Sequence, residues 1–291
     1  MTSISRREFT ARSAAVLASV LLPTAIPTRR AAPRLIVRGD DMGYAHAGNE
    51  ALIECHANGI ETTIELLVPS PWFPEAVRML AEHDTIDVGV HLTLTSEWDT
   101  VKWRPLTTAP SLRDADGHFF PMLSPNANYP RRSVSENEWR MEDVEREFRA
   151  QVELAKRHVP RVSHVSGHMG CVNALPGVKA MTRRLAREYG VDIWLEDHGV
   201  LSIGYKGPHL TSAEKIEGFL GMLDSLEGGK TYLFVDHPGF DTPELRAIHH
   251  IGYEQVAVDR QGVTDTFTSP RVREQIRQRG IELVSYRDIT R

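Results

Sequence analysis

Four segments of the sequence place carboxylates or imidazoles at or near the end of an apolar, strand-like run. They contain Asp40 and Asp41 in GDDMG, His91 in GVHLTLT, His164 and His168 in SHVSGHMG, and Asp236 and His237 in FVDHPG. These side chains bind divalent cations and move protons in hydrolases. Two adjacent carboxylates also repel each other unless a cation or a shared proton relieves the repulsion. The pair Asp40 and Asp41 therefore needs a specific explanation.

One Asp and two His from different strands suit a catalytic metal site that leaves a position open for water or substrate. A divalent cation bound by Asp41 would offset the repulsion and leave Asp40 ionised as a base. His91 is expected to point away from the aliphatic side of its strand, which carries Val88 and Val90, because side chains alternate along a strand.

Each candidate also has a simpler explanation. Asp40 and Asp41 could cap a helix, His91 could be a buried core histidine, and Asp236 with His237 could form a turn. The convergence of four strand ends of one sheet favours the metal site, which remains a hypothesis.

Aromatic and imidazole side chains elsewhere leave two further questions open. Trp98, Trp103 and Trp139 could form a platform for a sugar or a small local core. His249 and His250 lie in a polar segment and are predicted to be solvated.

Strand-like and helix-like segments alternate along the chain, which predicts a parallel sheet. Strands are expected at 34–39, 60–69, 86–95, 161–169, 191–197, 231–239 and 281–289. Helices are expected at 47–59, 74–83, 142–159, 179–190, 212–226 and 270–280. Seven strands favour an α/β barrel or near-barrel, with a long insertion over 96–135, after the third strand. Active sites of such folds lie at the carboxyl ends of the strands.

The length allows one large α/β domain or two small ones, and a single (β/α) barrel domain is expected over residues 33–291, without nucleic-acid binding. The chain has 291 residues, 41% of them hydrophobic, and a formal net charge of −5, whereas a nucleic-acid binder would carry a basic patch. The two cysteines, Cys55 and Cys171, form no disulfide framework and are expected to be packing residues.

The first 32 residues predict a Tat-type signal peptide and export to the periplasm or the medium. Arg6 and Arg7 precede Phe9 and a modest apolar stretch over 14–26. That stretch is too short and too interrupted by proline for a stable membrane span. The simpler alternative is a disordered tail in which two arginines occur by chance.

The motifs DDMG, GVHLTLTSEW, SHVSGHMG and DHPG together resemble those of the YdjC-like carbohydrate deacetylases. The resemblance extends from about residue 34 to 290. It implies a distorted TIM-like barrel and metal-dependent removal of acetyl groups from N-acetylated sugars.

The resemblance also implies roles for five residues. Asp41, His91 and His168 correspond to the metal ligands, and one divalent ion, Zn or Mg, is the expected cofactor. Asp40 corresponds to the general base, and His237 to the general acid.

The chain departs from the family pattern at two positions. Ser166 stands where the family commonly has an aspartate, and Glu65 stands where small polar residues are common. A catalytically impaired, exported carbohydrate-binding protein on the same scaffold is therefore the alternative function. A metal-dependent phosphoesterase is weaker, because it would need more carboxylates and cationic phosphate clamps. Homo-oligomerisation stays open.

Overall fold

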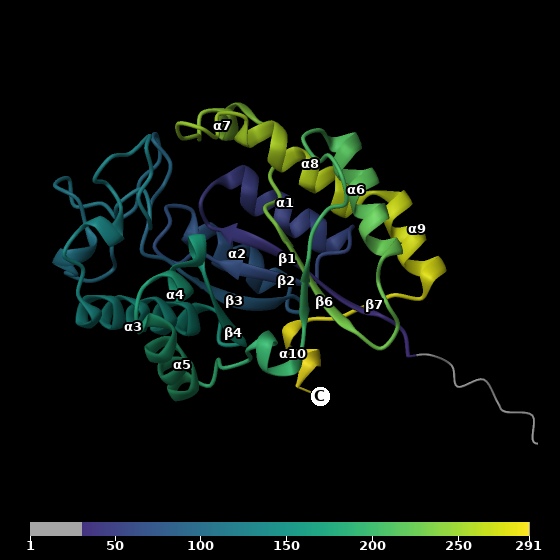
Figure 1. The fold of residues 1–291 in the computed structure, drawn as a ribbon, viewed down its shortest axis with the longest axis horizontal. Helices are drawn as coiled ribbons and strands as arrows, with labels where there is room; N and C mark the ends of the chain where they lie inside the picture. Colours follow the sequence, from purple (N-terminus) through teal and green to yellow (C-terminus); the bar gives the residue numbers. More distant parts are fainter. Residues whose placement is uncertain (1–30, 291) are drawn as a thin grey trace, which may run out of the picture. The chain divides into compact units, whose positions relative to one another are not determined.

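A curled sheet of parallel strands forms the centre of residues 31–290, the part of the chain that the computed structural model describes (Figure 1). The strands run in the order β4-β3-β2-β1-β6-β5, and β7 pairs with β1 beyond the end of the β1–β2 pairing. Their bounds are β1 (Arg34–Met42), β2 (Thr63–Leu66), β3 (Asp87–Leu92), β4 (His164–Gly167), β5 (Leu201–Ile203), β6 (Thr231–Asp236) and β7 (Glu282–Leu283). Among the described strands, β4 and β5 are not paired with each other, so the barrel is open between them. The predicted distorted TIM-like barrel is confirmed.

Helices cover the outer face of the sheet (Figure 1). The longer ones are α1 (His46–Ala57), α2 (Phe73–Glu82), α3 (Met141–His158), α5 (Val178–Tyr189), α6 (Ser212–Asp224), α8 (Val256–Thr268) and α9 (Pro270–Arg279). The short ones are α4 (Cys171–Ala174), α7 (Pro243–Arg246) and α10 (Tyr286–Ile289). Val88 and Val90 share a buried apolar cluster with Val144 and Phe148 of α3, as the alternation along β3 predicts. Within the described residues, no helix combines the length and the apolar character needed to cross a bilayer.

The strand prediction over 191–197 is wrong. Residues 191–194 form no regular element, and a 3-10 turn follows at Leu195–His198. Ile193 and Leu195 pack against an apolar cluster that contains Ile36 and Val284. The strand beside β6 is instead β5, further along the chain.

Two other expectations also need correction. The strand predicted over 281–289 is reduced to β7, and α10 follows it. Helix α8 had no counterpart among the predicted helices.

The long insertion after the third strand is present, between β3 and α3. Cys55 and Cys171 are buried free thiols. The predicted signal peptide lies outside the described residues, except for its last two.

Candidate metal centre

An irregularity at the end of β1 brings Asp40 and Asp41 to the same cavity. The register runs from Gly39 opposite Ile64 to Met42 opposite Leu66, so β1 contains one extra residue there. Asp41 takes up the bulge with φ of 73°, a conformation that is costly without glycine and is found mostly where a function needs it. In a regular strand the two carboxylates would point to opposite faces. Here both line a cavity of about 430 Å³.

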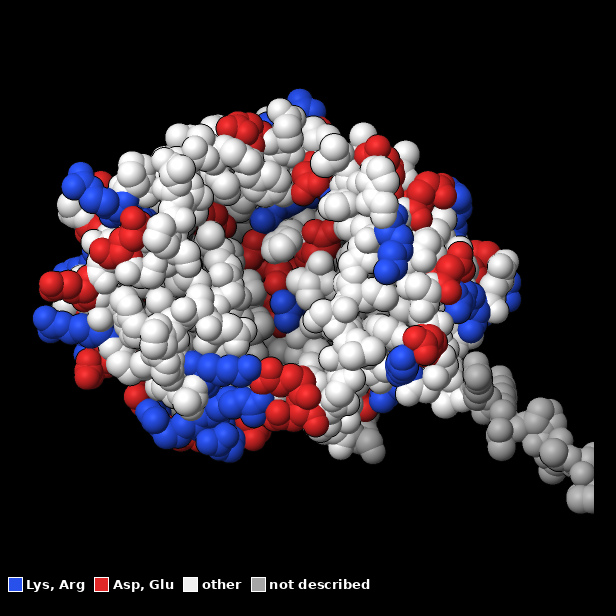
Figure 2. Space-filling model, in the orientation of Figure 1, with Lys and Arg blue, Asp and Glu red and all other residues white. Residues whose placement is uncertain are grey.

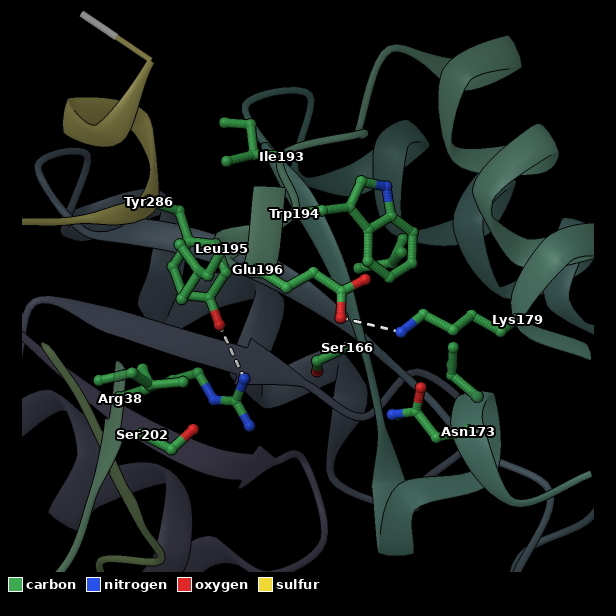
Figure 3. Close-up of a pocket in the computed structure, with 14 residues that line it drawn as sticks. Arg38, Ser166, Asn173, Lys179, Ile193, Trp194, Leu195, Glu196, Ser202 and Tyr286 are labelled. Carbon is green, nitrogen blue, oxygen red and sulfur yellow. Dashed lines mark hydrogen bonds and ion pairs between the residues drawn. The ribbon is translucent and has the colours of Figure 1, made fainter. Parts of the chain in front are cut away.

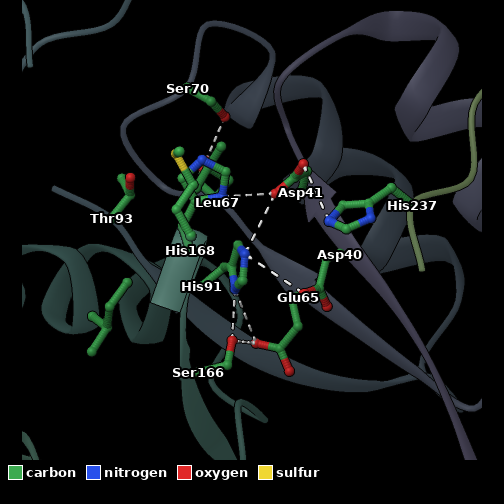
Figure 4. Close-up of polar contacts among 12 residues, drawn as sticks. Asp40, Asp41, Glu65, Leu67, Ser70, His91, Thr93, Ser166, His168 and His237 are labelled. Carbon is green, nitrogen blue, oxygen red and sulfur yellow. Dashed lines mark hydrogen bonds and ion pairs between the residues drawn. The ribbon is translucent and has the colours of Figure 1, made fainter. Parts of the chain in front are cut away.

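The cavity opens at the face of the molecule that Figure 2 shows, where acidic side chains lie at the floor of a hollow. Asp41, His91 and His168 each offer one ligand atom, and the three atoms lie within 4.8 Å of one another. Oδ1 of Asp41 lies 3.0 Å from Nδ1 of His168 and 3.4 Å from Nε2 of His91 (Figure 4). All three side chains are buried, yet among the described residues this oxygen has no hydrogen-bond partner of proper geometry.

The other nitrogen of each histidine meets a hydrogen-bonding partner. Nε2 of His168 lies 3.0 Å from Oε2 of Glu97, and Nδ1 of His91 lies 2.7 Å from Oγ of Ser166. Histidines that bind metals use one ring nitrogen for the metal and donate the other N–H to such a partner. An orphaned carboxylate oxygen facing two imidazole nitrogens therefore fits a divalent cation.

The charges around Asp41 hold it ionised. Burial raises the pKa of Asp41, but His168 and His237 outweigh burial and lower the pKa well below its usual value. Oδ2 accepts a hydrogen bond of 3.0 Å from Nη2 of Arg260 on α8. Sequence reasoning missed Arg260, because the helix that carries it was not predicted.

Asp40 is adjacent to the metal-ligand candidates but is held separately. Arg38 donates to its two carboxylate oxygens from Nε at 2.7 Å and from Nη2 at 2.9 Å. Arg38 is itself held by the hydroxyl of Tyr286, 2.8 Å from Nη1. The nearest oxygen of Asp40 is 3.8 Å from Nε2 of His91. Asp40 can therefore face the cavity as a fixed carboxylate.

His237 lies on the opposite side of Asp41, just after β6. Its Nε2 is 3.9 Å from Oδ2 of Asp41, and its Nδ1 is 3.5 Å from Oδ1 of Asp236. Asp236 also accepts a hydrogen bond of 2.8 Å from Tyr205. Burial lowers the pKa of His237, but Asp41 and Asp236 outweigh it and raise the pKa. His237 can thus carry a proton at the edge of the cavity.

The comparison with known proteins agrees with this geometry. The model of the family described as YdjC-like protein matches residues 34–278. The chain belongs to the YdjC-like family. A protein named carbohydrate deacetylase 2 from Listeria innocua is 28% identical over 271 residues, which cover 88% of this chain and 98% of the relative. A carbohydrate deacetylase from Thermus thermophilus is 32% identical over 239 residues, which cover 74% and 80%.

A crystal structure from Enterococcus faecalis shares the YdjC-like fold. Its protein is described as a candidate cellobiose-phosphate cleavage protein. It superimposes with a TM-score of 0.70 at 24% sequence identity and covers 89% of this chain and 99% of its own. This likeness shows the fold alone.

One sequence candidate of this YdjC-like chain does not join the metal-ligand group. His164 is fully buried in β4, where its ring stacks on Tyr286 with centroids 3.5 Å apart. Its Nε2 lies 2.6 Å from Oε1 of Glu65. Burial raises the pKa of Glu65, but His164 and Arg38 outweigh it and lower the pKa to about 2.

Aromatic side chains border the cavity on the side of α8. Trp98 and His250 stack with ring centroids 5.6 Å apart, and both line the cavity together with Tyr253. His250, which was predicted to be solvated, is half-buried and stacks on Trp98 at the border of the cavity. Trp103 instead belongs to the local core, where its Nε1 donates to the carbonyl of Thr95.

A second cavity, of about 300 Å³, lies on the side of Ser166 that faces away from the candidate metal centre (Figure 3). Arg38, Ser166, Trp194 and Tyr286 are among its lining residues. Gly167 lines both cavities, so the second one adjoins the candidate metal centre from inside the open barrel.

Proposed function

We propose that this chain is a metal-dependent carbohydrate deacetylase that hydrolyses the acetamide group of N-acetylated sugars to an amine and acetate. The chain matches a YdjC-like relative named carbohydrate deacetylase 2 over almost the full length of that relative. The observation that supports the proposal most is the orphaned Oδ1 of Asp41, which faces one nitrogen of His91 and one of His168.

Asp41, His91 and His168 would hold one divalent cation. When bound, the cation would act as a Lewis acid on the acetyl carbonyl and on the attacking water. Two imidazole nitrogens and one carboxylate suit zinc better than magnesium, which prefers oxygen ligands. Glu97 and Ser166 would keep the two imidazoles in the orientation in which their free nitrogens face Asp41.

Asp40 would act as the general base. It takes one proton from the water while the water oxygen bonds to the carbonyl carbon. The bidentate contact with Arg38 fixes the plane of the carboxylate before the reaction begins, which avoids reorganisation during proton transfer.

His237 would act as the general acid. When the carbon–nitrogen bond breaks, the sugar nitrogen takes a proton from His237 and leaves as an amine, and acetate remains. Asp236 positions the imidazole from behind. The stacked pair Trp98 and His250, with Tyr253, offers the flat apolar surface against which a sugar ring packs.

Acetate release tests this proposal. The purified protein, loaded with zinc or with magnesium, should release acetate from at least one member of a panel of N-acetylated mono- and oligosaccharides. Metal-loaded protein that binds such a sugar but releases no acetate would favour the alternative function, a carbohydrate-binding protein. A phosphoesterase is less well supported, because within residues 31–290 Arg260 is the only Lys or Arg that lines the cavity, and it is already paired with Asp41.

We also propose that the protein is exported by the Tat route. The support is the pair Arg6 and Arg7 ahead of a weakly apolar stretch. Replacing both arginines with lysine should leave the precursor inside the cell. Export at an unchanged rate in that variant would contradict the proposal.

A further inference from the structure

Glu65 is a buried carboxylate that none of the proposed catalytic steps uses. It lies on β2 with no exposed surface, next to the candidate metal centre and away from its open side. A charged side chain is expensive to bury unless it is paired and hydrogen-bonded. Its partners therefore indicate why the sheet accommodates it.

Glu65 on β2 lies beside residues of β3 and β4. Glu65 pairs in register with Gly89 of β3, and Gly89 pairs with His164 of β4. A side chain at Gly89 would collide, because a Cβ there would lie 2.5 Å from both carboxylate oxygens of Glu65 and 2.5 Å from Nε2 of His164. The glycine leaves the space in which Glu65 and His164 meet. The carboxylate of Glu65 thus occupies a space that exists because residue 89 has no side chain.

The second oxygen of Glu65 connects to a metal-ligand candidate. Ser166 donates a hydrogen bond to Oε2 of Glu65, and Oγ of Ser166 is 2.7 Å from Nδ1 of His91 (Figure 4). His91 and Ser166 are register partners on β3 and β4, so the backbone holds this spacing.

The direction of these bonds follows from the available protons. A serine hydroxyl has one proton, and a carboxylate can only accept. Ser166 gives its proton to Glu65, so Oγ of Ser166 must accept from Nδ1–H of His91. The lone pair of His91 is then on Nε2, which faces Oδ1 of Asp41 at 3.4 Å.

We propose that Glu65 is a positioning residue that acts through Ser166 to orient His91 and fix its proton on Nδ1, so that Nε2 is free to bind the cation. Ser166 alone is a weak anchor, because a hydroxyl can rotate and can donate as well as accept. Glu65 removes that ambiguity. Because His164 and Arg38 hold Glu65 in turn, the chain supplies a buried carboxylate to His91 from β2. This inference rests on the proposed metal centre, since it concerns the affinity of that centre.

Zinc affinity of the metal-free protein, measured by calorimetry or competition with a chelator, provides the test. Glu65→Gln should weaken zinc binding about 10- to 100-fold, the usual effect of losing a partner of a metal-binding histidine. The matched control is Glu61→Gln, which changes another buried glutamate whose carboxylate oxygens have no hydrogen-bond partner in the described structure. The control should bind zinc as wild type does.

A rescue variant separates positioning from a general structural role. In the double variant Glu65→Gln, Ser166→Asp, a carboxylate contacts His91 directly, and the cavity beside Ser166 has room for it. Its zinc affinity should recover most of the loss. Ser166→Asp alone should bind zinc less well than the double variant, because it places two carboxylates together.

Ser166→Ala keeps the test decisive if Glu65→Gln fails to fold. It leaves the pair of Glu65 and His164 intact and removes only the connection to His91, so it should also weaken zinc binding. Unchanged zinc affinity in Ser166→Ala, or a double variant no better than Glu65→Gln, would overturn the inference. A wild-type protein that binds no zinc would instead contradict the proposed metal centre itself.

Discussion

The cavity contains histidines in two different surroundings, each with a polar partner on the second ring nitrogen. On the side of β3 and β4, the side chains of His91 and His168 are only 3% and 5% exposed. On the side of β6, the side chain of His237 is 38% exposed. A buried imidazole with a polar partner at each ring nitrogen is held in one orientation. A half-exposed imidazole can be reprotonated after each turnover, so burial separates the proposed metal ligands from the proposed general acid.

Asp41 belongs to both regions at once. Its Oδ1 faces the two buried histidines, and its Oδ2 faces Arg260 and His237. The bulge in β1 places this one side chain between the two sides. Changes at Asp41 should therefore affect both regions, whereas other changes should affect one.

The largest effect is expected for Asp41→Asn and for His91→Ala. Each removes a ligand from the buried side, so stoichiometric metal and acetate release should be lost together. Elemental analysis of purified protein and an acetate assay would measure the two losses. Full retention of metal in His91→Ala would contradict the ligand assignment.

A smaller and more selective loss is expected for Asp40→Asn. The variant keeps the shape of the side chain and removes its basicity. Acetate release should fall about 10²–10⁴-fold, the usual contribution of a positioned general base. Metal content should stay close to wild type. If Asp40→Asn lost metal as completely as Asp41→Asn, Asp40 would be a ligand and the base would lie elsewhere.

The sequence predicted the buried side of the cavity better than its open side. His91 and His168 lie at or just after the ends of β3 and β4, whose apolar residues are visible in the sequence, so parallel pairing brings them to one edge of the sheet. The bulge that turns Asp41 toward them was not predicted. Glu65 was noticed only as unusual, because its partners come from two other strands and no local pattern connects them. Burial by neighbouring strands is a tertiary property.

Two other features of the molecule depend on residues whose local sequence is misleading. Residues 191–197 predict a strand because apolar side chains alternate there, yet Ile193 and Leu195 pack against the apolar cluster that contains Ile36 and Val284. Arg260 lies on α8, whose sequence VAVDRQGVTDTFT lacks a clear helical apolar period. Its partners Tyr44 and Trp98, with ring centroids 4.4 Å and 5.2 Å from the guanidinium carbon, are remote in sequence.

His237→Gln should separate the two sides of the cavity. The variant removes the proposed acid but leaves the buried ligands untouched. We expect acetate release to fall about 10²-fold, at the lower end of acid–base contributions, since solvent can reach this side and supply a proton. Metal content should not change, and this can be checked by elemental analysis of the same samples. A loss of metal here would mean that His237 belongs with His91 and His168.

The smallest effect is expected for Asp236→Asn, and it concerns pH. An acid must be protonated to act, so kcat falls as pH rises through the pKa of His237 in the enzyme–substrate complex. Asp236 helps to raise that pKa, and its removal should lower it. The alkaline limb of the kcat profile should therefore move to lower pH. Tyr205→Phe is the matched control, because it removes the hydroxyl that donates to Asp236 and leaves the carboxylate charge in place. That charge would then act on His237 undiminished, so the limb should stay or move slightly to higher pH. Equal downward shifts in both variants would mean that Asp236 acts only through packing, and the half-exposed histidine would need another source for its raised pKa.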